Sequence, residues 1–182
     1  MMKNVLVIST SLRTRSNSEA LATEFARGAR EAGNMVEQVS LRDVDLAFCK
    51  GCLSCQKRGD GHCFMRDDAD ALTQKMATAD VLAFATPVYY YGMSGQMKAL
   101  LDRANPLFCV DYAFRDVYLL AAAAEDEGTT FDRTRIGLEG WVDCFPNARL
   151  AGAVYGGGLE APGDAASATG RLAEAFALGV AV

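Results

Sequence analysis

The chain has 182 residues, of which 51% are hydrophobic and 23% charged, and its formal net charge is −5. This composition is typical of a globular domain and excludes a disordered, collagen-like or coiled-coil chain. The acidic balance argues against nucleic acid or an anionic membrane as a partner. The longest apolar run, the eight residues of Val117–Ala124, is too short to span a bilayer. Because no signal-peptide cleavage pattern follows Met1, we expect one cytoplasmic domain over residues 1–182.

Strand-like and helix-like segments alternate along the chain. Short apolar runs predict strands over 5–8, 35–41, 81–86, 117–124 and 150–154. Capped, amphipathic segments predict helices over 18–31, 67–79, 94–104, 129–145 and 164–178. This alternation predicts a parallel sheet covered on both faces, an α/β sandwich. Ligands of such folds bind beyond the carboxyl ends of the strands, so the loops there are the candidate sites.

The loop after the first strand, Ser9–Ser18, contains hydroxyl side chains, one amide and two arginines, and no glycine. It therefore matches neither the Rossmann fingerprint nor the P-loop. Because it ends at a helix N-terminus, where free N–H groups favour an anion, we expect it to bind a monophosphate. Ser9, at the start of the loop, is included among the candidates. The alternative is that these residues only cap the helix, for which one or two of them would suffice.

Four of the six cysteines lie within fifteen residues of the irregular segment 42–66. A loop of this length in a compact domain is usually functional. The spacing C-x₂-C-x₂-C repeats the run that ligates iron–sulfur clusters in bacterial ferredoxins. Zinc, disulfides formed after loss of a cluster, and cysteines without any metal remain alternatives. The candidate metal ligands are Cys49, Cys52, Cys55 and Cys63.

Three consecutive tyrosines, Tyr89 to Tyr91, follow the third predicted strand. They cannot all face one core, so at least one should lie on the side of the cleft. Pro87, Val88 and Tyr89, with Gly92 beyond them, could supply the apolar contacts and backbone hydrogen bonds that a flat aromatic cofactor needs. A subunit interface is the alternative role, because tyrosine is enriched there too. Tyr90 suits either role equally.

These motifs resemble the NADPH-dependent FMN reductase family of flavodoxin-like flavoproteins over about the first 105 residues. The motifs are Thr10-Ser11-Leu12-Arg13, Ser16-Asn17-Ser18, Pro87-Val88-Tyr89 and Asp102-Arg103. The resemblance implies a flavodoxin-like sandwich with strand order 2-1-3-4-5 and FMN as the cofactor. It implies that Ser11, Arg13, Ser16, Asn17 and Ser18 hold the FMN phosphate. It further implies that Pro87, Val88, Tyr89 and Gly92 flank the flavin ring, with Ala123, Ala124 and Glu125 at its other edge. Tyr90 stays a candidate for the same contact. Thr10 departs from the glycine that is usual in the family.

The pattern C-x₂-C-x₂-C-x₇-C, followed by Asp67-Asp68, resembles the iron–sulfur flavoprotein branch of that family. The resemblance implies a [4Fe–4S] cluster near the flavin, and electron transfer between the two groups. The electron donor would be NAD(P)H or reduced ferredoxin, and the acceptor a quinone, dioxygen or a peroxide. A cluster-free NAD(P)H-dependent FMN or quinone reductase is the main alternative, and a zinc-bearing interaction domain is another. No general acid–base pair is evident, so we assign no catalytic residue and expect the protein to position and tune its cofactors. The exposed tyrosines and the resemblance both predict a homodimer or homotetramer.

Overall fold

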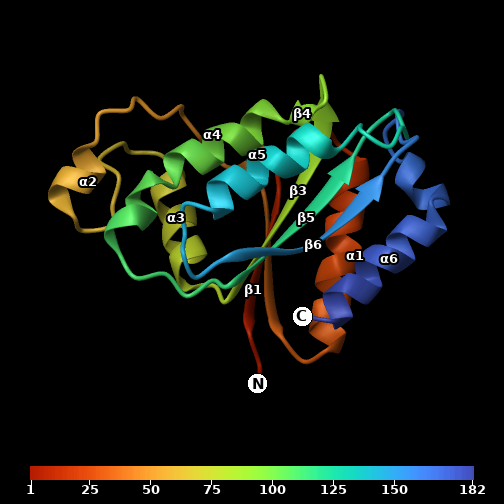
Figure 1. Ribbon diagram of the computed structural model, residues 1–182, viewed down its shortest axis with the longest axis horizontal. Coiled ribbons are helices and arrows are strands. Elements are labelled where there is room, and N and C mark those ends of the chain that lie inside the picture. The colour runs from red at the N-terminus through yellow and green to blue at the C-terminus, as the bar shows by residue number, and fades with distance from the viewer.

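A parallel sheet lies between two layers of helices in the computed structural model, which describes residues 1–182 (Figure 1). The strand order is β2-β1-β3-β5-β6, and β4 pairs with β3 alone, antiparallel to it. With this hairpin strand set aside, the order is the predicted 2-1-3-4-5, and the flavodoxin-like fold is confirmed. The strands are β1 (Asn4–Ser9), β2 (Met35–Ser40), β3 (Val81–Tyr89), β4 (Gly92–Met93), β5 (Asp116–Ala122) and β6 (Arg149–Gly156).

The helices lie close to the predicted positions, with two differences. The cysteine segment contains a short helix that was not predicted, and the closing helix is divided because Ala168, with ψ of 55°, interrupts it. A 3₁₀ turn over Asp164–Ser167 precedes that break. No helix combines the length and the apolar composition needed to cross a bilayer. The helices are α1 (Asn17–Glu31), α2 (Ser54–Arg58), α3 (Ala69–Thr78), α4 (Gly95–Arg103), α5 (Asp132–Val142) and α6 (Thr169–Val180).

Alternate residues of the strands supply two separate cores. On β1, Leu6 and Ile8 pack with the core under α3, α4 and α5, whereas Val5 and Val7 pack with the core under α1 and α6. Both faces of the central strands are thus buried, as expected of a parallel sheet. The carboxyl ends of β3, β5 and β6 emerge together at one edge of the sheet, near the start of α1 (Figure 1).

Strand β3 continues three residues beyond its predicted end, through Pro87 to Tyr89. Proline lacks the N–H with which a strand residue donates to a neighbouring strand, so it is found where a strand is unpaired on one side. The ladder between β1 and β3 ends at the pair of Ser9 and Ala85, while β5 continues beside β3 as far as Pro87. The proline therefore lies where β3 has a neighbour on one side only, and the strand can include it.

Helices α1 and α6 cross closely because glycine faces backbone on both of them. A Cβ atom at Gly28 would collide with the carbonyl oxygen of Phe176, and one at Gly179 would collide with that of Phe25. These two contacts fix the C-terminal helix against the first helix of the chain.

Candidate functional site

The loop between β1 and α1 ends in a capped helix N-terminus, as predicted. The Ser16 hydroxyl accepts a hydrogen bond from the backbone N–H of Glu19 at 3.3 Å, and lies 3.1 Å from the Ser18 hydroxyl. Both serines are buried. Arg15 has a φ of 56°, in the left-handed region, which turns the chain sharply into the helix. The start of α1 thus combines hydroxyl groups, free N–H groups and the positive end of the helix dipole, which suits a phosphate.

A pocket opens at this helix start and brings together most of the predicted cofactor-binding residues. The segments that follow β1, β3, β5 and β6 meet there, and the sequence predicted this for the first three. It is lined by Arg13, Ser16, Asn17, Ser18, Pro87, Val88, Tyr89, Ala122, Ala123, Ala124, Leu159 and Glu160. We call it the phosphate pocket.

A second pocket adjoins the first and shares Val88, Ala123 and Ala124 with it. Its remaining lining residues are Tyr90, Tyr91, Glu125 and Thr130. The Tyr91 hydroxyl donates a hydrogen bond to the Glu125 carboxylate at 2.6 Å, and this bond raises the pKa of Tyr91 above its usual value. We call this the ring pocket, because apolar and aromatic side chains form most of its lining.

A buried polar group of the ring pocket fits a bound FMN. Thr130 lines this pocket and is 2% exposed, and its hydroxyl has no hydrogen-bond partner. Unpaired buried hydroxyls are uncommon, because leaving one without a partner costs about 1–3 kcal/mol. An oxygen-rich ligand would supply such partners.

Three predicted residues lie outside the pocket linings. Ser9 and Ser11 are buried beneath the loop, where the Ser11 hydroxyl accepts a hydrogen bond from the Arg13 N–H at 3.3 Å. Gly92 pairs with Tyr89 in the β3–β4 hairpin. Between them, Tyr90 and Tyr91 have positive φ values of 51° and 63°, and the side chain of Tyr90 is fully exposed.

Asn17 has a role that the sequence did not predict. Its Nδ2 donates to the carbonyls of Leu159 and Ala161 at 3.2 and 2.9 Å. Its Oδ1 accepts from the N–H groups of Gly163 and Ala165 at 3.1 and 3.0 Å. The whole amide is therefore engaged with the segment 159–165, which forms one wall of the phosphate pocket. Asn17 anchors this wall, and its side-chain amide has no free N–H to donate to a phosphate.

The wall residues Leu159 and Glu160 were missed by the sequence analysis. Arg13 reaches the same wall, since its Nη1 donates to the Glu160 carbonyl at 2.9 Å. The glycine turn 156–158 at the end of β6 was the available signal, because it marks a further loop at the carboxyl edge of the sheet. Ligands of parallel α/β folds bind beyond the carboxyl ends of the strands, and this holds for the loop after β6 as well as for the loops after β1, β3 and β5.

The four clustered cysteines line one pocket, next to the end of α4. None of them forms a disulfide, and Cys55 is buried whereas Cys49 and Cys52 are exposed. Lys50, Leu53, Phe64, Met65, Arg103, Asn105 and Pro106 line the pocket with them. As arranged, no three His, Cys, Asp or Glu side chains lie close enough together to hold a metal ion.

Each of the four sulfurs has a hydrogen-bond donor beside it. The Gly51 N–H donates to Cys49 at 3.4 Å, and hydrogen bonds from Ser54 lower the pKa of the Cys52 thiol. Asn105 Nδ2 donates to the Cys55 sulfur and Arg103 Nη2 to the Cys63 sulfur, both at 3.6 Å. Burial raises the pKa of the Cys55 thiol. Donors of this kind suit sulfur atoms that carry negative charge, so the donor set fits thiolate ligands although the geometry is not that of a closed metal site.

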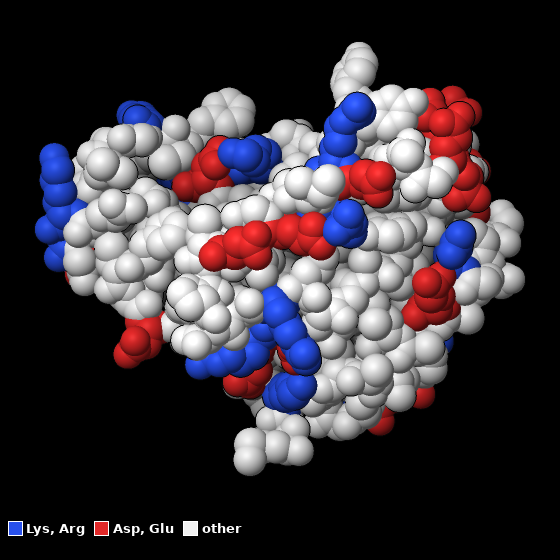
Figure 2. Space-filling model, viewed as in Figure 1, with Lys and Arg blue, Asp and Glu red and all other residues white.

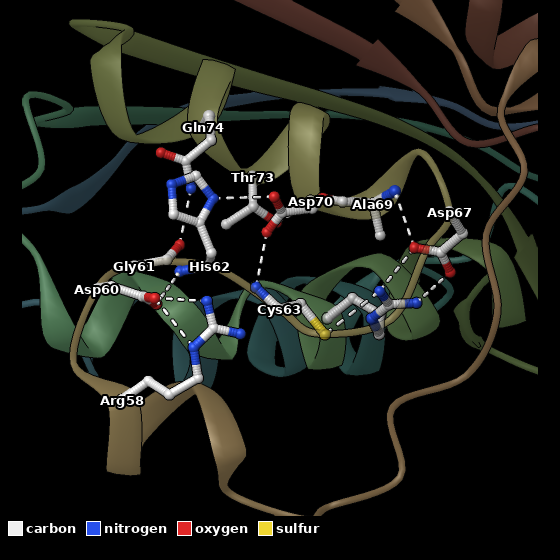
Figure 3. Close-up of polar contacts among 11 residues, drawn as sticks. Arg58, Asp60, Gly61, His62, Cys63, Asp67, Ala69, Asp70, Thr73 and Gln74 are labelled. Atoms are coloured by element: carbon white, nitrogen blue, oxygen red, sulfur yellow. Dashed lines mark hydrogen bonds and ion pairs between the residues drawn. The ribbon is translucent and has the colours of Figure 1, made fainter.

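Two carboxylates, Asp67 with a buried side chain and Asp70 with a half-buried one, tie the cysteine segment to the fold (Figure 3). Asp67 accepts hydrogen bonds from Arg103 and from the Ala47 N–H, and the bonds from Arg103 hold its pKa below the usual range. Asp70 accepts from the Cys63 N–H at 2.7 Å and lies 2.9 Å from His62 Nδ1 (Figure 3). The lone histidine is thus bonded to a carboxylate and does not line the cysteine pocket.

The cysteine pocket and the two strand-end pockets share no lining residue. Helix α2, in the cysteine segment, lies at the opposite side of the molecule from the carboxyl ends of β5 and β6 (Figure 1). The two candidate sites therefore have separate linings and lie on different sides of the chain, and the implied neighbourhood of cluster and flavin stays a prediction.

The strand order and the polar pocket at the start of α1 define a flavodoxin-like protein. The model of the NADPH-dependent FMN reductase family matches residues 3–133. The chain belongs to this family of flavin-dependent oxidoreductases.

Curated relatives of the chain carry the name iron–sulfur flavoprotein. One, from Methanocaldococcus jannaschii, is 39% identical over 103 residues, which are 57% of this chain and 52% of the relative. Another, from Methanosarcina thermophila, is 33% identical over 109 residues, 60% of this chain and 56% of the relative. The chain thus spans about half the length of the curated relatives it matches.

Among solved structures, an NAD(P)H:quinone oxidoreductase from Methanothermobacter marburgensis has a TM-score of 0.72 at 17% identity. The match covers 99% of this chain and 98% of that one. At this identity the likeness shows the shared fold alone.

Proposed function

We propose that the chain is an oxidoreductase that binds FMN at the strand-end pockets and a [4Fe–4S] cluster at Cys49, Cys52, Cys55 and Cys63. The observation that carries the flavin assignment is the meeting of the α1 start, the β3 end and the β5 end around one pair of adjoining pockets. The cluster assignment is supported by four free thiols that line one pocket. It is also supported by the names of the curated relatives.

The residues of the chain would bind and position the two groups. The helix start at Ser16 and Ser18, with Arg13 beside it, would hold the phosphate. Val88 and the backbone of Ala123 and Ala124 would flank the ring. When bound, FMN supplies one- and two-electron transfer and the cluster supplies one-electron transfer.

A ferredoxin-like donor suits the surface of the cysteine segment. Residues 48–66 carry Lys50, Lys57, Arg58 and Arg66 against a single acid, Asp60, although the whole chain has a net charge of −5. Basic side chains lie along the edge of the molecule that carries α2 (Figure 2). A basic surface beside a redox centre favours an acidic protein partner. NAD(P)H remains the other proposed donor, with a quinone or another small molecule as the acceptor.

Anaerobic purification tests the proposal. We expect about four iron atoms and four acid-labile sulfides in each chain, together with stoichiometric flavin. Mass spectrometry of the heat-released flavin should give FMN, because the loop Ser9–Ser18 contains no glycine past which a pyrophosphate could run. Serine variants of Cys49, Cys52, Cys55 and Cys63, made one at a time, should lose iron and keep flavin. Serine variants of Cys109 and Cys144 should keep both and serve as controls.

A cluster-free NAD(P)H-dependent FMN or quinone reductase is the second candidate. It is favoured by one observation, that no three potential ligands of a metal converge as the side chains are arranged. Normal flavin content and NAD(P)H turnover in a protein that takes up no iron, even after anaerobic reconstitution, would select it over the first.

A further inference from the structure

Two of the donors that face the cysteine sulfurs come from outside the cysteine segment. Arg103 ends α4, and Asn105 follows two residues later in a 3₁₀ turn (Asn105–Cys109). They reach the sulfurs of Cys63 and Cys55, respectively. The end of one helix thus delivers two N–H donors to one wall of the cysteine pocket.

Both donors are held in fixed orientations. The Arg103 guanidinium is 2% exposed, donates to both oxygens of Asp67, and donates to the Ala47 carbonyl at 2.8 Å. The Asn105 amide is oriented by Gln56, whose Nε2 donates to Asn105 Oδ1 at 3.0 Å and leaves Nδ2 for Cys55. The donors are therefore in place before any change of charge at the sulfurs.

The chemistry of these contacts depends on the charge of the sulfur. A neutral thiol is a weak acceptor, whereas hydrogen bonds to an ionised group are roughly twice as strong as neutral ones. Arg103 also has its Nε buried without a partner, so one N–H donor of the guanidinium is left unsatisfied by the chain's own acceptors. More negative charge at the sulfurs strengthens both contacts, and fixed donors need not reorganise to respond.

We propose that Arg103 and Asn105 bias the iron–sulfur centre at the cysteine pocket toward its reduced form. The inference rests on the function proposed above. On reduction the centre gains one electron from its donor and one negative charge, and no bond is made or broken. The two donors stabilise the reduced form more than the oxidised one, and so they raise the midpoint potential.

The test is the midpoint potential of the centre, measured by a dithionite titration followed by electron paramagnetic resonance. Asn105→Leu removes the donor to Cys55 without adding charge, and should lower the potential. Asn105→Asp replaces the donor with a negative charge, and should lower it further. A tenfold loss of preference for the reduced form corresponds to 59 mV in a one-electron couple. Arg103→Lys should lower the potential less than Asn105→Asp, since a cationic donor remains.

The matched control is Asn34→Asp, which makes the same change of charge just before β2 begins, whereas the cysteine segment follows the other end of that strand. There the Oδ1 atom that accepts from the Lys3 N–H is retained. Its potential should equal that of the parent. Thermal unfolding of each apo-protein separates tuning of the potential from a structural role. If Asn105 and Arg103 are only structural, their substitution lowers stability and iron content but leaves the midpoint potential of the remaining centres unchanged. An unchanged midpoint potential would overturn the inference. A parent protein that binds no iron would instead overturn the proposed function.

Discussion

The anchor formed by Asn17 makes a quantitative prediction. Asn17→Ala removes four hydrogen bonds to the segment 159–165. Each is worth about 0.5–1.5 kcal/mol net. The backbone at Ala161 is exposed and can turn to water, whereas the Ala165 N–H is buried. The four bonds sum to about 2–6 kcal/mol. We therefore expect a loss near the lower end of that range, about 2–3 kcal/mol of unfolding free energy.

For a chain of this size, that loss lowers the unfolding temperature by about 4–12 °C. The assay is thermal unfolding of the apo-protein, followed by circular dichroism. FMN affinity should also fall, because Leu159 and Glu160 form part of the phosphate pocket. Asn34→Ala is the reference variant for the loss of stability, because it removes a single backbone-to-side-chain hydrogen bond, that of the Lys3 N–H.

The two possible roles of Asn17 predict opposite patterns. An anchor destabilises the apo-protein when it is removed, before any flavin is added. A phosphate ligand leaves the apo-protein unchanged and acts on the dissociation constant of FMN alone. An Asn17→Ala protein that unfolds at the parent temperature and has lost FMN binding would refute the anchor.

Three further predictions follow from the geometry. Arg13→Ala should weaken FMN binding about tenfold or more in a fluorescence titration, since charge-assisted hydrogen bonds are worth about 1.5–3 kcal/mol, and unchanged affinity would place the phosphate elsewhere. Gly179→Ala should destabilise the protein by about 1–3 kcal/mol, because the new Cβ meets the Phe25 carbonyl, whereas Gly170→Ala in the same helix meets open space and should be neutral or stabilising. Light scattering should give a mass well above 19.5 kDa, because exposed aromatic side chains favour association, and a monomer mass would contradict this.

Local patterns predicted most of the fold. The β-branched run of β1 and the Ser16 cap of α1 are signals that lie within a few residues of the structure they specify. The alternation of strands and helices predicted a parallel sheet, whereas the strand order came from the resemblance to flavodoxin-like flavoproteins. The cofactor loops followed from the strand ends, and the phosphate pocket brings most of their residues together.

The rest depends on contacts that no local pattern encodes. Asn17 bonds to residues that lie 142–148 positions away, and its own neighbourhood predicted a phosphate ligand instead. The β3–β4 hairpin turns through Tyr90 and Tyr91 at positive φ, where glycine or asparagine is the usual signal. Two of the donors to the cysteine sulfurs are Arg103, at the end of α4, and Asn105, in the turn after it, which lie 40 and 50 positions from the cysteines they reach.

The wall of the phosphate pocket also bears on how the protein is made. Residues 13–18 leave the ribosome well before residues 159–165, which complete the pocket. Domains generally fold as units, and pairing of distant segments is slow because the chain between them must first be ordered. A nascent chain therefore carries an incomplete phosphate pocket until residues 159–165 have emerged, and we expect flavin to bind only after that.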